Sequence, residues 1–208
     1  EFWAGDGGAV HGSGDGRGGS GGNLSKFTLT SLGGDDHRHF AQGGRGSRQP
    51  KNRPLGHVPA LELGDGTVLT ESRAICTYFE AVHPEPNLMG VDAKERAVIE
   101  MWDRRVELTY MAQIGGWFRN THPAMAEMEK PQSAEWAEIC QGRARKHAGF
   151  LDQRLAVSPY IAGDRFTIAD ITLHVAMGFG RVVKFRPWEE HPNLAAWRER
   201  VIARPGLA

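Results

Sequence analysis

The glycine content of this chain changes abruptly near residue 52, and this change limits where a folded core can lie. Residues 1–52 hold 15 of the 27 glycines, in strings such as GDGRGGSGG. Glycine loses more backbone freedom on folding than any other residue, so this composition opposes regular structure. Only residues 27–32, FTLTSL, alternate apolar and polar side chains as a half-buried strand does. We therefore expect the packed core to come from the rest of the chain.

Two interpretations of residues 1–52 remain open. The first is a low-complexity leader that does not fold. The second is that these letters come from a GC-rich gene read out of frame, because such a reading also yields Gly, Arg, Asp and His in this mixture. The residues alone are consistent with both.

The segment after this opening predicts a β-hairpin followed by a helix. The apolar run VPALEL, the turn signal GDG and the run TVL indicate strands over residues 60–63 and 67–69. Thr70, Glu71 and Ser72 then indicate a helix that ends near Val82, because hydroxyl and acidic side chains suit an electropositive first turn. The proline-rich stretch HPEPNLMG, residues 83–90, is the best candidate for a domain boundary.

From residue 92 onward the apolar spacing is that of helices. It predicts a long helix over about 92–118, a second over about 134–156, a third that begins at FTIAD, and a last one over 193–203. The positions expected to be buried are Val98, Met101, Trp102, Leu108, Met111 and Ala112 in the first helix, Trp136, Ile139, Cys140, Ala144, His147, Phe150 and Leu151 in the second, and Leu194, Trp197 and Val201 in the last.

The third helix carries a strong start signal. Thr167 can cap the amide of Asp170, while the Asp170 carboxylate reaches back to the N–H of Thr167. Phe166 and Ile171 stand at the positions of a hydrophobic staple. A cap of this kind is worth about 1 kcal/mol, so we expect this helix start to matter for folding.

Composition excludes several classes of function. Lys plus Arg equals Asp plus Glu, 25 against 25, which argues against nucleic acid and against an anionic membrane surface as partners. Only Cys76 and Cys140 occur, without a Cys-x-x-Cys pair, so we expect no disulfide framework and a reducing, cytoplasmic location. No apolar run reaches membrane-spanning length, and the first residues do not resemble a signal peptide. The HRH motif at residues 37–39 lacks further ligands, so no metal is expected.

Three segments resemble the cytosolic glutathione S-transferase family, bacterial type. NRPLGHVPALELGDGTVLTESRAI, residues 52–75, is similar to the family's Asn-Pro-x-Gly-x-Val-Pro-x-Leu and Glu-Ser-x-Ala-Ile segments. YIAGDRFTIADI, residues 160–171, resembles the capping segment of its helical domain, and HPNLAAWRERVIARP, residues 191–205, resembles its closing helix. Residues 1–52 carry no such resemblance, but their number is close to the family's opening strand, helix and strand, which favours the out-of-frame interpretation.

The resemblance implies an α/β domain followed by an all-α domain. A thioredoxin-like glutathione-binding domain would cover residues 1–82, although its opening β-α-β unit is not recognisable. Residues 83–91 would be a linker, and residues 92–208 an all-helical domain.

The resemblance places the cysteinyl part of glutathione beside Val58 and Pro59. In the family the proline at this position is cis, which turns the N–H and C=O of the preceding residue outward so that an extended peptide can pair with them. An ordinary trans proline at a strand start is the alternative. His57 stands where several classes of the family contact the peptide with a polar side chain, and a solvated loop histidine is equally compatible with the sequence.

Glu71, Ser72 and Arg73 are expected to bind the γ-glutamyl end of glutathione. This end carries an ammonium and a carboxylate, so its site needs an anion for one and hydrogen-bond donors for the other. The Ser72 hydroxyl and amide at a helix N-terminus suit the carboxylate, and the charge of Glu71 suits the ammonium. Arg73 is a weaker candidate on the same turn. Simple helix capping by the same residues is the alternative, and we expect capping in either case.

The sequence leaves the thiol-activating residue unknown. A free thiol has a pKa near 8.5, and the family lowers it with a Tyr, Ser or Cys near the start of the first helix. Ser13 and Ser20 are the hydroxyls in that region, and neither has a strand-to-helix context, so we assign neither. For the second substrate, an apolar electrophile, the resemblance suggests Tyr110, Met111 and Trp117, together with Gly115 and Phe118, with core packing as the alternative.

Three functions follow from this interpretation. The first is a transferase that joins glutathione, as co-substrate, to a hydrophobic electrophile in detoxification or catabolism. The second is a non-catalytic binding or scaffold protein of the same fold. The third, a glutathione-dependent thiol reductase, ranks last because no cysteine precedes Cys76. By resemblance we also expect a homodimer.

Overall fold

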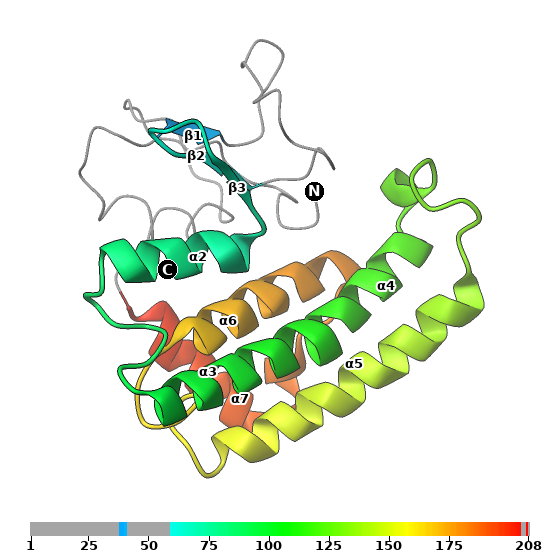
Figure 1. Ribbon diagram of the computed structural model, residues 1–208. Coiled ribbons are helices and arrows are strands. Elements are labelled where there is room, and N and C mark those ends of the chain that lie inside the picture. Colours follow the sequence, from blue (N-terminus) through cyan, green and yellow to red (C-terminus); the bar gives the residue numbers. More distant parts are fainter. Residues whose placement is uncertain (1–37, 41–58, 205–206, 208) are drawn as a thin grey trace. The chain divides into compact units, whose positions relative to one another are not determined.

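The computed structural model describes residues 38–40, 59–204 and 207 of the chain (Figure 1). It divides into two compact units, and the division falls between Pro86 and Asn87, inside the segment expected to be a linker. The first unit contains the described strands and one helix. The second is helical.

The described part of the first unit contains an antiparallel sheet whose strand order is β1, β2, β3. Strand β2, Ala60–Glu62, pairs with β3, Val68–Thr70, as the predicted hairpin requires. Gly66 adopts a φ of 84° in the connecting turn, where glycine meets no steric penalty. Strand β1, Arg38–Phe40, pairs along the other edge of β2 and was not predicted, because it comes from the glycine-rich opening.

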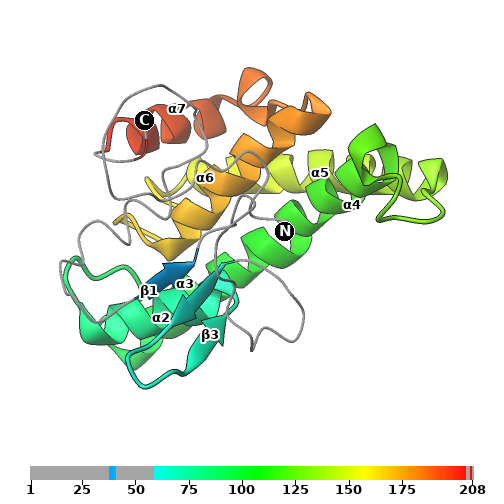
Figure 2. The same cartoon turned by 90° about the horizontal axis from the view of Figure 1, so that it is seen from above.

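Helix α2, Ser72–Val82, covers this hairpin, and Figure 2 shows it next to the strands. Its end matches the prediction. Ile75 and Phe79 point from α2 into a small core around Leu61 of β2. The residues that border this core are Leu63, Leu69 and Tyr78. The apolar side chains of the hairpin and those spaced four residues apart in α2 therefore pack in one cluster.

The helical unit contains five long elements in the described part of the chain. Their bounds are Ala93–Arg105 for α3, Ala112–Thr121 for α4, Ala134–Leu155 for α5, Ile168–Gly180 for α6 and Pro192–Ile202 for α7. A π-helical segment, η1, Val106–Met111, joins α3 to α4 without a break, so the predicted long helix is confirmed and continues to Thr121. In Figure 1, α4 and α5 lie side by side, and they pack against each other. Short 3-10 turns complete the unit at Pro123–Met125, Arg181–Val183 and Pro187–Glu189.

The buried face of the first long helix differs from the predicted one. Leu108 is 60% exposed and Met101 is 38% exposed, although both were expected in the core. Side chains four residues apart share one face of a helix, and the buried face follows this spacing from Trp102 through Val106 and Tyr110 to Ile114. Within this stretch the Ala112 N–H bonds to the Glu107 C=O, five residues back, as in a π turn. The observed core positions are Ile99, Trp102, Val106, Tyr110, Met111 and Ile114.

The buried face of α5 was also predicted incorrectly in part. Trp136, Ile139 and Phe150 are exposed, and half of the buried positions on α5 are alanines. A Cβ atom added to Gly116 of α4 would lie 2.6 Å from Cys140 Sγ, so the two helices approach too closely for large side chains. The buried positions on α5 are Ala137, Cys140, Ala144, Ala148, Leu151 and Leu155.

The predicted start of α6 is confirmed. The hydrogen bonds of Asp170 at this start extend beyond those of a helix cap. Asp170 Oδ2 accepts from the N–H of Thr167 at 2.9 Å and from its hydroxyl at 3.2 Å, within a capping box. Asp170 Oδ1 accepts from Ile161 N–H at 2.9 Å and from the indole N–H of Trp197 at 2.8 Å. Asp170 is fully buried, as are Leu194, Trp197 and Val201 of α7. This carboxylate therefore joins the α5–α6 connection, α6 and α7.

A second network holds the start of the helical unit. Arg165 donates from Nε to Glu95 Oε1 at 2.7 Å and from Nη2 to Asn87 Oδ1 at 2.6 Å. Glu95 Oε2 also accepts from Val91 N–H at 2.8 Å. The hydrogen bond from Arg165 holds the pKa of the Glu95 carboxyl below its ordinary value.

Candidate functional site

The predicted glutathione-binding residues fall only partly within the described chain. His57 and Val58 lie outside the described residues, so the geometry of the bond between Val58 and Pro59 does too. Pro59 is half-buried and directly precedes β2. Glu71, Ser72 and Arg73 lie together at the junction between β3 and α2.

The junction between β3 and α2 is a single residue, Glu71. Strand β3 ends at Thr70 and α2 begins at Ser72, so the backbone changes from extended to helical within the single residue between them. Glu71 meets this need with φ 65° and ψ 117°. A positive φ in a residue with a side chain costs about 1–3 kcal/mol and occurs mostly at functional sites. The residue types around Glu71 did not predict this conformation.

The Glu71 side chain does not cap the helix. It is exposed, and although Glu71 occupies the N-cap position its carboxylate makes no capping hydrogen bond. The expectation that Glu71 caps α2 through its side chain is therefore wrong, and the backbone of Glu71 lies outside the extended conformation usual for an N-cap residue. Among the described residues this carboxylate has no capping partner, so it can meet a cation.

Ser72 stands at the first helical position of α2. The N–H groups of a first helical turn have no acceptors inside the helix and form the positive end of its dipole. The half-buried Ser72 hydroxyl adds a further donor beside them. An anion fits at this place, one residue from the exposed carboxylate of Glu71. The pair has the polarity that a zwitterionic α-amino acid group requires.

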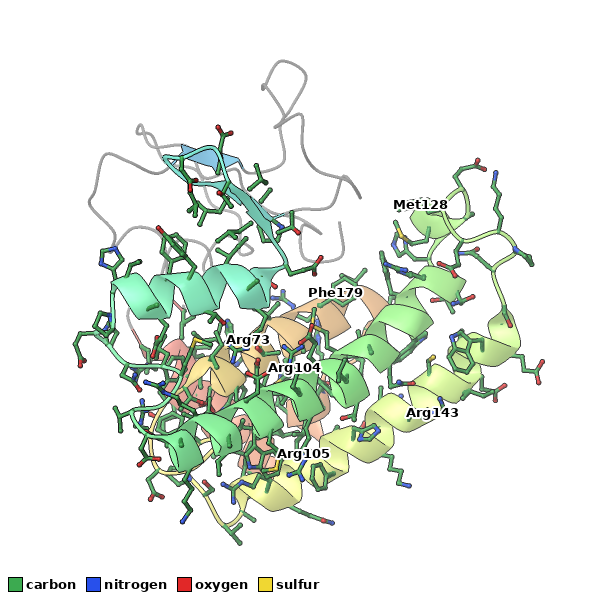
Figure 3. The ribbon with its side chains drawn as sticks, viewed as in Figure 1. Arg73, Arg104, Arg105, Met128, Arg143 and Phe179 are labelled. Atoms are coloured by element: carbon green, nitrogen blue, oxygen red, sulfur yellow. The ribbon has the colours of Figure 1, made fainter. Side chains whose placement is uncertain are left out.

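Arg73 is held within its own helix. Its Nη1 lies 3.4 Å from Thr77 Oγ1, and the Thr77 hydroxyl donates in turn to the Arg73 carbonyl at 2.9 Å. The side chain projects from the side of α2 that faces away from β2 and β3 (Figure 3). Arg73 contributes positive charge to the first turn of α2, and its guanidinium already lies close to the Thr77 hydroxyl.

In the helical unit, one ring brings two of the predicted second-substrate residues together. The ring of the buried Phe185 lies 6.5 Å from that of Tyr110 and 5.9 Å from that of Trp117, between ring centroids. Met111 is buried next to Tyr110 in the chain. Phe185 follows the Arg181–Val183 turn, far from α4 in sequence, and sequence reasoning did not find it because no local pattern marks it.

A second aromatic contact joins α4 to α6. Phe118 packs edge-to-face against Phe179, with centroids 5.2 Å apart, and its ring lies 4.9 Å from that of His122. Figure 3 labels Phe179 on α6. Phe179 was not predicted either. The rings of Trp117 and Phe118 on α4 thus each contact an aromatic residue from a distant part of the chain.

The Tyr110 hydroxyl has an unusual environment. Tyr110 is fully buried, and its hydroxyl has no hydrogen-bond partner among the described residues. Burial raises the pKa of this phenol far above its ordinary value. The group therefore stays protonated at all physiological pH values, as a hydrogen-bond donor.

The two thiols differ in exposure. Cys140 is buried, and burial raises its pKa, so it is a poor nucleophile. Cys76 of α2 is half-buried. Within the described residues, no group of three or more His, Cys, Asp or Glu side chains is arranged to hold a metal ion. No described helix is long and apolar enough to cross a membrane.

Two family models match the chain. The model of the glutathione S-transferase N-terminal domain matches residues 36–87, and that of the glutathione S-transferase C-terminal domain matches residues 109–205. The first match begins inside the glycine-rich opening, at the segment that contains β1. The similarity thus starts earlier than the motifs indicated.

Individual relatives agree with these matches. Glutathione S-transferase 2 of Saccharomyces cerevisiae is 36% identical over 153 residues, which cover 73% of this chain and 66% of that protein, just under two thirds of its length. The crystal structure of a Gtt2-class glutathione S-transferase of Vibrio parahaemolyticus is 32% identical, with a TM-score of 0.72 and coverage of 88% of both chains. A probable elongation factor 1-gamma 1 of Arabidopsis thaliana is 31% identical over 76% of this chain, but only 37% of that protein is covered.

Proposed function

Because the chain belongs to the glutathione S-transferase family, we propose that it binds glutathione and joins the whole molecule, through its thiolate sulfur, to a hydrophobic electrophile. The thioredoxin-like unit would bind glutathione, and the helical unit would supply the apolar surface for the second substrate. The thiolate sulfur forms a bond to an electrophilic carbon, and the leaving group departs with the electron pair of the bond that breaks. The protein's part is to orient the two reactants and to favour the thiolate.

The observation that carries this proposal is the Glu71–Ser72 junction. The backbone at Glu71 is held in a costly conformation, and its carboxylate is exposed without a capping role. In the proposed complex this carboxylate meets the γ-glutamyl ammonium. The Ser72 hydroxyl and the first-turn amides meet the γ-glutamyl carboxylate. Arg73 adds favourable charge near the same carboxylate.

The upstream residues complete the proposed binding mode. Val58 pairs through its backbone with the cysteinyl unit of glutathione, provided that Pro59 is cis, and His57 contacts the same peptide. The group that lowers the pKa of the glutathione thiol belongs to the opening of the chain, and we assign it to no residue.

Calorimetric titration with glutathione tests the binding site. Glu71→Gln keeps the size of the side chain and removes its charge, and Ser72→Ala removes one donor. Each change is expected to weaken binding by roughly 10- to 150-fold, because each removes a charge-assisted contact worth about 1.5–3 kcal/mol. Glu85→Gln, an exposed glutamate beyond the end of α2, is the matched control. Equal affinities in all four proteins would remove the basis of the proposal.

A binding or scaffold protein of the same fold is the second candidate. The similarity to a protein named for translation elongation favours it. Tight glutathione binding together with no turnover of any electrophile would select this candidate over the transferase.

We further propose a cytoplasmic homodimer. Several large apolar side chains of α3, η1 and α5 are exposed, namely Met101, Leu108, Trp136, Ile139 and Phe150. A second copy of the chain would remove them from water. Light scattering on the wild type and on Trp136→Glu tests this surface: a dimer that becomes monomeric in the variant supports it, and a monomeric wild type refutes it. In the described part of the chain neither Cys76 nor Cys140 forms a disulfide, which fits a reducing compartment.

A further inference from the structure

The connection between α4 and α5 carries three side chains of kinds that bind soft metal ions. They are His122, Met125 and Met128, in the pattern His-x-x-Met-x-x-Met, and the 3-10 turn Pro123–Met125 follows the histidine directly. Met128 is 61% exposed, and Figure 3 labels it in this connection. His122 and Met125 are half-buried. An ion in solution can therefore reach this part of the chain.

The backbone of this segment turns with the same three-residue period. The Met125 N–H donates to the His122 C=O at 2.9 Å, and the Met128 N–H donates to the Met125 C=O at 3.0 Å. Each bond spans three residues, as in a 3-10 helix, where side chains at i and i+3 lie above one another. With a rise of about 2.0 Å per residue, neighbours in such a row are roughly 6 Å apart. The backbone therefore carries the three residues along one side of the segment, in a row short enough for their side chains to meet at one ion.

His122 turns one ring nitrogen toward the same segment. Its Nδ1 accepts a hydrogen bond from the Ala124 N–H at 3.2 Å, at the long end of the normal range. This nitrogen therefore carries a lone pair rather than a proton. The hydrogen bond is exposed, so water can replace it at the Ala124 N–H when a metal ion takes the lone pair. The ring lies 4.9 Å from that of Phe118, between centroids, and this contact holds it without an ion.

The segment is anchored to the helices at both of its ends. The side-chain amide of Gln132 donates to the Arg119 C=O at 2.7 Å and to the His122 C=O at 3.0 Å. Asn120 Oδ1 accepts from the Ser133 N–H at 2.8 Å. These bonds join the end of α4 to the start of α5. Because the turn is already held in this way, binding an ion orders little further backbone.

We propose that His122, Met125 and Met128 form a binding site for copper(I). Thioether sulfur is a soft ligand that selects copper(I), and imidazole suits copper as well. Zn²⁺ and Mg²⁺ prefer thiolates, imidazoles and carboxylates, and the described residues contain no group of three such side chains that could hold an ion. The prediction that no metal is bound considered the histidine pattern and did not weigh the thioethers.

This site goes beyond the proposed transferase function and does not depend on it. All three ligands belong to one connection within the helical unit. A chain that binds no glutathione would still bind copper(I) here, so the two proposals fail separately.

Methionine-methyl NMR tests the site one residue at a time. Labelling the methionine methyl groups with ¹³C gives one signal for each of the six methionines of the sequence, and single Met→Leu variants assign them. Copper(I) is added without oxygen to the full chain carrying Cys76→Ser, because an accessible thiolate would compete for the ion. The signals of Met125 and Met128 should move together and stop moving at one equivalent. Met101, which is 38% exposed on α3, is the matched control, and its signal should stay in place.

Competition with a coloured copper(I) chelator measures the affinity. Met125→Leu, Met128→Leu and His122→Gln should each weaken binding by roughly 10- to 100-fold, a loss that even a supporting contact to a metal ligand can cause. Met101→Leu should leave the affinity unchanged. Leucine keeps the volume of methionine, so the variants should fold, and the signals of the buried Met111 and Met177 report on this.

Two results would overturn the inference. The first is equal movement of the Met101 and Met128 signals without saturation, which indicates weak binding to any exposed sulfur. The second is an affinity for copper(I) that none of the three ligand variants changes. Zinc(II), added in place of copper(I), should move neither the Met125 nor the Met128 signal, and movement of both would contradict the choice of a soft ion.

Discussion

Replacing Asp170 by alanine should destabilise the helical unit more than almost any other single change. The carboxylate accepts four hydrogen bonds, from two groups of Thr167, from Ile161 N–H and from Trp197 Nε1. All four donors lose their acceptor in the variant, and the site is fully buried. At the low end of the cost of an unsatisfied buried group, about 1 kcal/mol each, the free energy of unfolding falls by roughly 4 kcal/mol.

Urea denaturation followed by tryptophan fluorescence measures this change, since Trp197 is one of the four donors. Asp164→Ala is the matched control, because Asp164 is exposed in the connection that leads to the same helix. Its cost should stay within about 0.5 kcal/mol. If Asp170→Ala and Asp164→Ala unfold at the same urea concentration, the network does not stabilise the unit and the reasoning is wrong.

Three further changes probe other parts of the structure. Gly116→Ala should cost about 1–3 kcal/mol through overpacking against Cys140 Sγ, and Cys140→Ala in the same chain should recover part of this loss; additive costs would refute the clash. Glu95→Gln should lower stability by about 1 kcal/mol at neutral pH, and the difference should vanish as pH falls below the ordinary glutamate pKa, because Arg165 lowers the pKa of this carboxyl only in the folded chain; a difference that persists at low pH would contradict this origin. Glu71→Gly should raise the free energy of unfolding by about 1 kcal/mol while weakening glutathione binding, and a loss of stability would show that the positive φ carries no strain.

Local signals in the sequence predicted a large part of this fold. The turn signal GDG located the hairpin, and the Thr167–Asp170 spacing located the start of α6, because both depend on interactions within a few residues. The apolar periodicity gave the number and extent of the helices. On α5 it correctly gave Cys140, Ala144 and Leu151 but wrongly placed Trp136, Ile139 and Phe150 in the core, because the close contact with α4 depends on how two distant segments approach.

The sequence likewise predicted only part of the candidate site. The Glu-Ser pair indicated a binding function, but the conformation of Glu71 follows from the tight junction between β3 and α2 and has no signature in the residue types. Phe185 and Phe179 contact the rings of Trp117 and Phe118 from other parts of the chain. The missing hydrogen bond of Tyr110 likewise becomes visible only when its neighbours are known.

The close contact between Gly116 and Cys140 has a consequence for the durability of the protein. The proposed transferase function would expose the protein's own cysteines to alkylation. Cys140 is 1% exposed, and its thiol is held in the protonated, unreactive form by burial. The alanine-lined packing of α4 on α5 thus shields one of the two thiols from the proposed substrates. Self-inactivation would then begin at the half-buried Cys76, on the helix that begins at the Glu71–Ser72 junction.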